Sequence, residues 1–189
     1  MTGRGLSTEV SWACVEPARG TYDDAELQRL RAHIAAPDSE RRIVLHSGAL
    51  PDWVIARDGW LAEDVLASWG TFVDRVIRSL GHEVAVWVTF DSPLTEAAWY
   101  GRDQRRVARV LLDAHAMAYL AIHHGPGSGG RSTRVGIRER SDGSRRFRWT
   151  AKALVATLQT GRIRMPFGLV GELPNGTPAL DFVEWKTGE

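Results

Sequence analysis

Cysteine is almost absent from this sequence, which excludes a fold held together by internal disulfides. The 189 residues include one cysteine, Cys14, and it has no partner within the chain. A chain without internal disulfides fits a reducing compartment, so we predict a cytoplasmic protein. Cys14 has no basic neighbour in its predicted strand, which argues against a nucleophilic role.

Long apolar runs and a strong net charge are also missing. No apolar run approaches the ~18 residues of a membrane span, and the opening MTGRGLSTEV lacks the hydrophobic segment of a signal peptide. The formal net charge is +1, so no strong field favours nucleic acid or an anionic membrane. We therefore expect neither nucleic acid nor a membrane among the partners.

Signatures of metals and cofactors are absent as well. His123 and His124 are adjacent and would face apart on a helix, which does not suit a shared metal ion. The glycine-rich residues 125–130 lack the G-K-[ST] ending of a phosphate-binding loop. The sequence therefore predicts no metal site and no cofactor.

The composition that remains is globular and rich in tryptophan. The chain is 43% hydrophobic and 25% charged, and its length is enough for one sizeable core, so we predict a single domain over residues 1–189. Eight tryptophans can fill a core or line a pocket, and the core is the commoner location.

Apolar patterns alternate between strand-like and helix-like segments. Short apolar or alternating runs predict strands at residues 9–15, 43–45, 84–90, 134–138 and 180–185. Longer amphipathic runs predict helices after the capping residue Asp23 and at residues 62–80, 103–123 and 151–160. This alternation predicts an α/β parallel sheet, either a barrel or a doubly wound sheet.

Several segments, in order, resemble the motifs of one enzyme family. SWACVEP at residues 11–17 is similar to E-W-A-R-I-E-P, and LHSGALPDW at 45–53 is similar to L-H-H-[FW]-[DT]-L-P-x-W. WVTFDSP at 87–93 is similar to W-x-T-F-N-E-P, and weaker matches follow as far as residue 182. The chain thus resembles glycoside hydrolase family 1, the β-glucosidase family of (β/α)8 barrels. The resemblance implies a TIM-barrel-like (β/α) fold truncated to roughly strands two to six of the family barrel.

The chain differs from this family at the positions of the family's catalytic and sugar-binding residues. The resemblance places Ser92 at the position of the acid/base glutamate, Asp91 at the preceding asparagine and Ser47 at the sugar-binding histidine. We expect no counterpart of the nucleophile segment, which follows strand seven in the family. Retaining hydrolysis needs two carboxyl groups about 5 Å apart, so we predict a degenerate member that lacks both catalytic carboxylates.

We interpret the chain as a binding or scaffolding protein for a small glycoside or aromatic molecule. The predicted substrate-binding residues are those around the former active-site mouth: Trp12, Trp53, Trp87, Trp99, Ser47 and Ser92. Alternatively, a repurposed biosynthetic enzyme would use Asp91 as general base, with His46 or Glu96 assisting. Residual β-glucosidase activity, or a remnant that only binds a partner protein, also stays open.

Structural roles for the same polar residues are further alternatives. Asp91 could keep the hydrogen bonds of an asparagine, Glu96 could lie at a solvated helix start, and His46 could be a satisfied core histidine. For His115, on an otherwise apolar helix face, we predict a core histidine bonded to a carbonyl.

A sheet of five strands would leave unpaired edges and an exposed inner face. We expect a homo-oligomer or a protein partner to cover them, unless residues 145–149 add a strand that closes a smaller barrel. Residues 131–148 hold seven arginines against two acids, Glu139 and Asp142. We interpret this segment either as a solvated loop or as a surface for a polyanion or an acidic protein.

Overall fold

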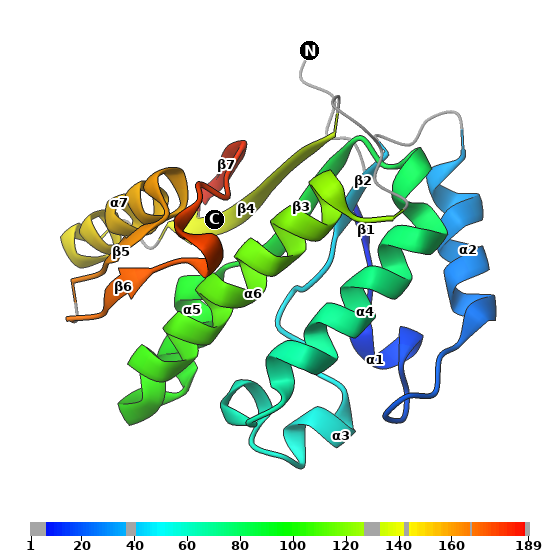
Figure 1. Cartoon of the computed structure of the whole chain (residues 1–189), viewed down its shortest axis with the longest axis horizontal. Coiled ribbons are helices and arrows are strands. Elements are labelled where there is room, and N and C mark those ends of the chain that lie inside the picture. Colours follow the sequence, from blue (N-terminus) through cyan, green and yellow to red (C-terminus); the bar gives the residue numbers. More distant parts are fainter. Residues whose placement is uncertain (1–6, 37–40, 127–132, 142–143, 167, 188–189) are drawn as a thin grey trace.

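Five parallel strands form one sheet in the order β1-β2-β3-β4-β7 (Figure 1). The structure is a computed structural model that describes residues 7–36, 41–126, 133–141, 144–166 and 168–187. The strands are β1 Thr8–Glu9, β2 Arg42–Val44, β3 Val86–Asp91, β4 Arg134–Ser141 and β7 Phe182–Thr187. The predicted α/β parallel sheet is confirmed, and its strands lie side by side in chain order, as in a segment of a (β/α) barrel.

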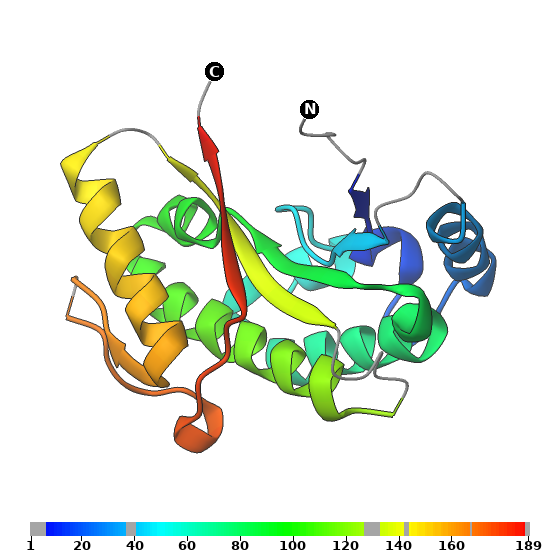
Figure 2. The ribbon, with the colours of Figure 1, turned by 90° about the horizontal axis from the view of Figure 1, so that it is seen from above.

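Helices connect these strands and cover one side of the sheet. The α-helices are α1 Trp12–Val15, α2 Asp24–Ile34, α3 Asp52–Ile55, α4 Val65–Leu80, α5 Pro93–Trp99, α6 Gln104–His124 and α7 Arg145–Thr160, and the 3-10 turns are η1 Gly59–Leu61, η2 Gly81–Glu83, η3 Gly101–Asp103 and η4 Pro174–Gly176. In Figure 2, α4 and α6 lie along the same side, where the Trp69 indole donates to the Ala114 carbonyl at 3.0 Å. None of the described helices is long and apolar enough to cross a lipid bilayer.

The predicted strand at residues 9–15 is wrong over most of its length. Strand β1 ends at Glu9, the Val10 amide still donates to the Val44 carbonyl at 2.9 Å, and residues 12–15 form the short helix α1. The Ser11 side chain accepts a hydrogen bond from the Cys14 amide at 3.2 Å, which starts the helical turn. The first and last residues of α1 then share the buried side, while Cys14 is exposed. Alternation over so few residues fits a strand and a single helical turn equally well.

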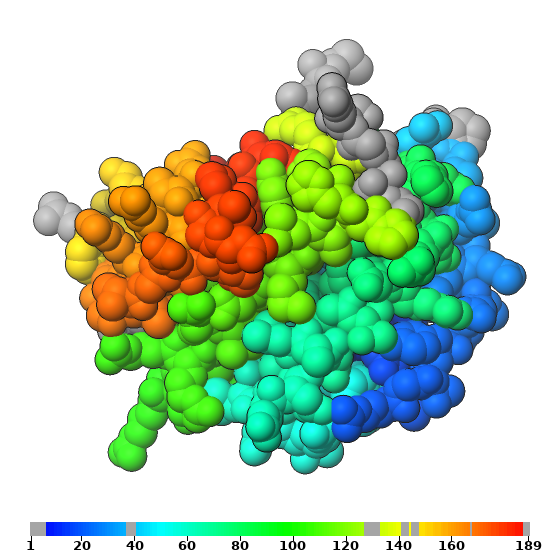
Figure 3. Space-filling view, in the orientation of Figure 1, coloured from blue at the N-terminus to red at the C-terminus, as the bar shows by residue number. Residues whose placement is uncertain are grey.

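The C-terminal region also differs from the prediction. Residues 145–149, considered as an extra strand, are instead the first turns of α7. An antiparallel hairpin of β5 (Arg162–Arg164) and β6 (Val170–Glu172) follows, and three-residue strands are too short to give a periodic signal. The orange atoms of this hairpin lie beside green atoms of α6 in Figure 3, where Arg105 donates to the Gly168 carbonyl at 2.8 Å.

The side of the sheet opposite α4 and α6 carries a network of ion pairs. Ile137 packs in a helix-side cluster, so strand alternation places its neighbour Arg138 on the opposite side. There Arg138 lies 2.9 Å from Glu184 of β7, and Glu184 lies 2.9 Å from Arg42 of β2. These pairs keep the open side of the sheet polar, which lessens the apolar exposure expected of a half-barrel.

β1 and β7 lie at the two edges of this sheet, and each pairs with one strand among the described residues. An unpaired edge can accept a further strand from another chain. The homo-oligomer or covering partner stays a prediction.

Candidate functional site

The carboxyl ends of the parallel strands border a cavity of about 350 Å³. Five residues predicted from the sequence line it together: Asp91, Glu96, Ser47, Ser92 and Trp99. Side chains from three other strand ends join them: Glu9, Arg140 and Lys186. Strand ends are where (β/α) folds place their chemistry, so the cavity occupies the position expected of a binding site in this architecture.

A strained turn presents the end of β3 to this cavity. Ser92 has φ 64° and ψ 49°, a left-handed conformation that residues other than glycine rarely adopt. The pairing of β3 with β4 shifts between Val88 and Asp91, and the Ser92 amide donates to the Arg138 carbonyl at 2.7 Å. Without the shift, Asp91 would share the helix side with Thr89. The irregularity instead turns the Asp91 carboxylate toward the ion pairs and the cavity.

Asp91 is held as a carboxylate by cations from two other strands. Its oxygen lies 2.8 Å from the Lys186 ammonium and 3.3 Å from the Arg138 guanidinium, and the Ser92 hydroxyl donates to it at 2.9 Å. Burial alone would raise the pKa of Asp91, but hydrogen bonds from Lys186, Ser92 and Arg138 outweigh burial and hold that pKa below its ordinary value. A carboxylate stabilised in this way is a poor proton donor and a weak general base.

Glu96, which helps to line the cavity, forms a buried pair with His46. The His46 Nε2 atom lies 2.8 Å and 2.9 Å from the two Glu96 carboxylate oxygens, and the Trp60 indole donates to Glu96 at 2.5 Å. His46 is 1% exposed and Glu96 is 3% exposed. The solvated helix start considered for Glu96 is therefore wrong, because aromatic rings and His46 surround its carboxylate. The satisfied core histidine considered for His46 is confirmed.

Three of the four tryptophans predicted to hold a ligand lie away from the cavity. Trp12 is 1% exposed, and its indole donates to the Glu16 carboxylate at 2.8 Å. Trp53 packs edge-on against Trp12 and donates to the Glu16 carbonyl at 3.0 Å. Trp87 is fully buried in the helix-side core. Of the four tryptophans, Trp99 borders the cavity, and Trp12, Trp53 and Trp87 do not line it.

A further carboxylate, Glu139, lies fully buried near the cavity, and sequence reasoning missed its position. It accepts hydrogen bonds from the Leu94 amide at 3.1 Å and from the Arg140 amide at 3.2 Å. Burial raises the pKa of Glu139 to about 7, against the effect of these two amides, and the nearby charge of Asp91 adds to the increase. Glu139 is therefore the described carboxyl group near this site that would exchange a proton around neutral pH.

His115 has the structural role predicted for it. It is 2% exposed, its Nε2 donates to the Ala179 carbonyl, and its Nδ1 lies 2.6 Å from the Thr89 hydroxyl. Burial lowers the pKa of His115 to about 4, so the ring is neutral near pH 7. The prediction of a core histidine bonded to a carbonyl is confirmed.

Solved β-glucosidase structures share this fold. The chain is 20% identical to a β-glycosidase from Pyrococcus horikoshii, with a TM-score of 0.76 over 97% of this chain and 48% of that one. A β-glucosidase from Exiguobacterium marinum gives a TM-score of 0.74 at 16% identity, over 96% and 53% of the two chains. A family 1 β-glucosidase from Thermotoga maritima gives 0.72 at 15% identity, over 96% and 49%.

The chain spans about half the length of these structures. No family model matches it. At identities this low the likeness concerns the fold, and it confirms the truncated TIM-barrel architecture that the motifs predicted. The chain therefore has the fold of about half of a family 1 β-glucosidase barrel.

Proposed function

We propose that this chain is a glycosidase-like binding protein that holds a small glycoside or related polyhydroxylated molecule without hydrolysing it. The observation that carries the proposal is the cavity at the strand ends, where one exposed indole lies among polar groups. The Trp99 side chain is 70% exposed, and its flat ring suits the apolar face of a sugar. The Ser47 hydroxyl and the Asp91 carboxylate offer partners for ligand hydroxyl groups.

The carboxylates around the cavity support binding better than catalysis. A retaining glycosidase needs one carboxylic acid that donates a proton and a second carboxylate about 5 Å away. Asp91 is paired with two cations, and both oxygens of Glu96 accept hydrogen bonds within the core. A general base at Asp91 would have to act against its pairing with Lys186 and Arg138. The repurposed enzyme is therefore the less well supported alternative.

The solved structures suggest suitable probes. The β-glucosidase from Thermotoga maritima has been solved in complex with deoxynojirimycin and with castanospermine. We choose deoxynojirimycin and methyl β-D-glucoside as probes for this chain, because each presents several hydroxyl groups on one six-membered ring. Both are small enough to enter a cavity of about 350 Å³.

The test is a titration of the protein with each probe, followed by NMR chemical shifts or calorimetry. We expect saturable binding that Trp99→Ala weakens at least about tenfold, equivalent to about 1.4 kcal/mol, because the stacking surface is lost. Trp149→Ala is the matched control, since Trp149 is 63% exposed and lies outside the cavity. We also expect no turnover of 4-nitrophenyl β-D-glucoside above the rate in buffer.

Two results would contradict this proposal. One is equal affinity of the Trp99→Ala and Trp149→Ala variants for the probes, and the other is no binding of either probe. Either result would show that the cavity is not the binding site. Turnover of the chromogenic glucoside that Asp91→Asn abolishes and Trp149→Ala retains would instead establish catalysis at Asp91.

A further inference from the structure

Positive charge is concentrated in one segment of this nearly neutral chain. Residues 143–171 hold six cationic side chains and no carboxylate: Arg145, Arg146, Arg148, Lys152, Arg162 and Arg164. The formal net charge of the whole chain is +1, so the rest of it is net acidic. Segregation of this kind creates a local positive potential that the overall charge conceals.

The fold gathers the end of this segment into a hairpin held between two helices. The amides of Arg162 and Arg164 in β5 approach threonine hydroxyls at the end of α7, at 3.3 Å and 3.4 Å. On the other edge, Arg109 of α6 donates to the Glu172 carbonyl of β6 at 2.9 Å. Ile163 is buried beneath the hairpin. Strand alternation therefore turns the side chains of Arg162 and Arg164 together to the exposed face.

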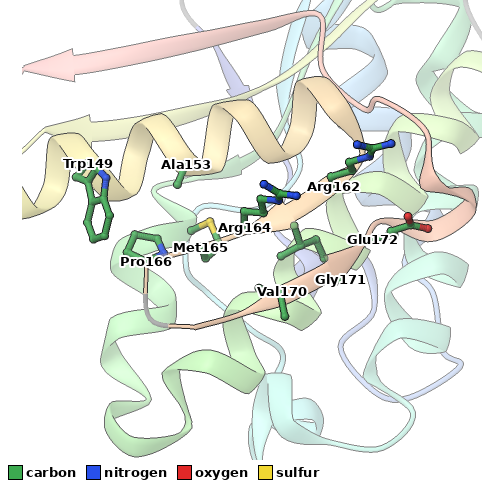
Figure 4. Close-up of a pocket in the computed structure, with 10 residues that line it drawn as sticks. Trp149, Ala153, Arg162, Arg164, Met165, Pro166, Val170, Gly171 and Glu172 are labelled. Carbon is green, nitrogen blue, oxygen red and sulfur yellow. The ribbon is translucent and has the colours of Figure 1, made fainter.

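A groove of about 790 Å³ lies along this face, between α7 and the hairpin (Figure 4). Trp149 extends from α7 at one end, and Arg164 lies near the middle (Figure 4). Trp149 is 63% exposed and Val170 is 72% exposed, so two large apolar side chains border the groove. Glu172 lies at the end opposite Trp149 in Figure 4. The groove combines an apolar wall with two guanidinium groups and one carboxylate, that of Glu172, which is the cross-strand neighbour of Arg162.

The side chains of Arg162 and Arg164 have no hydrogen-bond or ion-pair partner among the residues that the structure describes. They contrast with Arg138 and Arg42, whose guanidinium groups are paired with carboxylates of this chain. Two guanidinium groups on alternate residues of a strand lie about 7 Å apart. An extended peptide with carboxylates at alternate positions has the same spacing.

We propose that this groove docks an extended acidic segment of a partner protein. Its carboxylates at alternate positions pair with Arg162 and Arg164, and an apolar side chain beside them packs against Trp149 and Val170. Desolvated aromatic and arginine anchors of this kind dominate the free energy of binding at protein interfaces. A nucleic acid would instead call for a continuous basic strip, whereas here apolar side chains make up much of the groove wall.

The test is calorimetric titration with the synthetic peptide Ac-GESEFLG-NH2 and its neutral analogue Ac-GQSQFLG-NH2. We expect the acidic peptide to bind and the neutral one to bind at least tenfold more weakly. The double variant Arg162→Gln/Arg164→Gln should weaken binding of the acidic peptide at least tenfold, and Trp149→Ala should weaken both peptides. Binding of the acidic peptide should also weaken as sodium chloride rises from 50 to 500 mM.

The matched control is Arg78→Gln/Arg102→Gln, which removes the same charge from exposed arginines outside the groove. Unchanged binding in this control, with loss in the groove variant, supports the proposal. Equal loss in both variants, or no binding of the acidic peptide at 1 mM, overturns it. Tighter binding of a 15-nucleotide oligothymidine through the same arginines would also overturn it, by making the occupant a nucleic acid. Far-UV circular dichroism verifies that each variant is folded.

Discussion

Glu96 and Asp91 lie on consecutive elements and border the same cavity, but their carboxylates have opposite surroundings. Glu96 is 3% exposed and accepts hydrogen bonds from the Trp60 indole and His46 within an aromatic core. Asp91 faces the polar side of the sheet and pairs with Lys186 and Arg138. The first carboxylate organises the core, whereas the second organises the charges that border the cavity. A position at a strand end is therefore not sufficient for chemistry, because the partners of a carboxylate determine what it can do.

The largest loss of folding stability should come from removing the buried carboxylate of Glu96. Glu96→Ala leaves the Trp60 N–H and His46 without a partner in the core, and we expect a loss of about 3–5 kcal/mol in the free energy of unfolding. Urea denaturation measures the loss. Glu26→Ala is the control, because it removes a partly buried carboxylate whose partner, Arg29, is 67% exposed, and it should cost less than about 1 kcal/mol. Similar losses in the two variants would show that Glu96 does not organise the core.

A second prediction concerns Glu139, which lies near Asp91 but is buried like Glu96. Its folded-state pKa is about 7, above the ordinary value of 4.5, so the folded protein retains a proton that the unfolded chain releases. Stability should therefore fall as pH rises from about 4.5 to 7, by about 3 kcal/mol in total. Glu139→Gln should flatten this decline in urea denaturation measured between pH 4.5 and 8. An unchanged slope in the variant would place the titrating group elsewhere.

The smallest loss of folding stability should come from neutralising Asp91, on the polar side of the sheet. Asp91→Asn removes a charge that two cations stabilise, but the Lys186 side chain is 40% exposed, so we expect a loss of only about 1–2 kcal/mol at pH 7. Because the folded-state pKa of Asp91 is lowered, its contribution is fully present above the unfolded pKa of about 4 and is lost as pH falls through the folded value. Thermal melts of both proteins from pH 7 to pH 3 should therefore converge at low pH.

The control for this third prediction is Asp103→Asn, which removes an exposed carboxylate 3.5 Å from Arg106. We expect its melts to match the parent protein at every pH. A constant difference between Asp91→Asn and the parent down to pH 3 would show that the ion pairs of Asp91 do not stabilise the fold.

Local patterns were sufficient for much of the helical structure. Asp23 was predicted to cap a helix, and its carboxylate accepts hydrogen bonds from the Ala25 and Glu26 amides at 2.9 Å and 3.1 Å. The long apolar stripe of α4 gave the helix that the structure contains at Val65–Leu80. These features depend on residues within a few positions of each other, so a short window of sequence carries all the necessary information.

Local patterns did not predict which tryptophans are buried. Residue type and position near a strand end did not distinguish Trp99, which is 70% exposed, from Trp87, which is fully buried. Trp87 belongs to the helix side of β3, whereas Trp99 ends α5 beside the cavity. Whether a tryptophan lies in the helix-side core or beside the cavity depends on how α4, α5 and α6 pack. That packing cannot be predicted from a local sequence motif.

The order of the strands, the parallel sheet and the replacement of the expected glutamate by Ser92 all follow from the amino-acid sequence. The partners of the two carboxylates emerge only in three dimensions. Lys186 meets Asp91 across 95 residues of chain, and Trp60 meets Glu96 across 36. Strand register and helix packing create these contacts, and both depend on the burial of the whole core. The tertiary structure therefore decided which carboxylate stabilises the core and which faces the cavity.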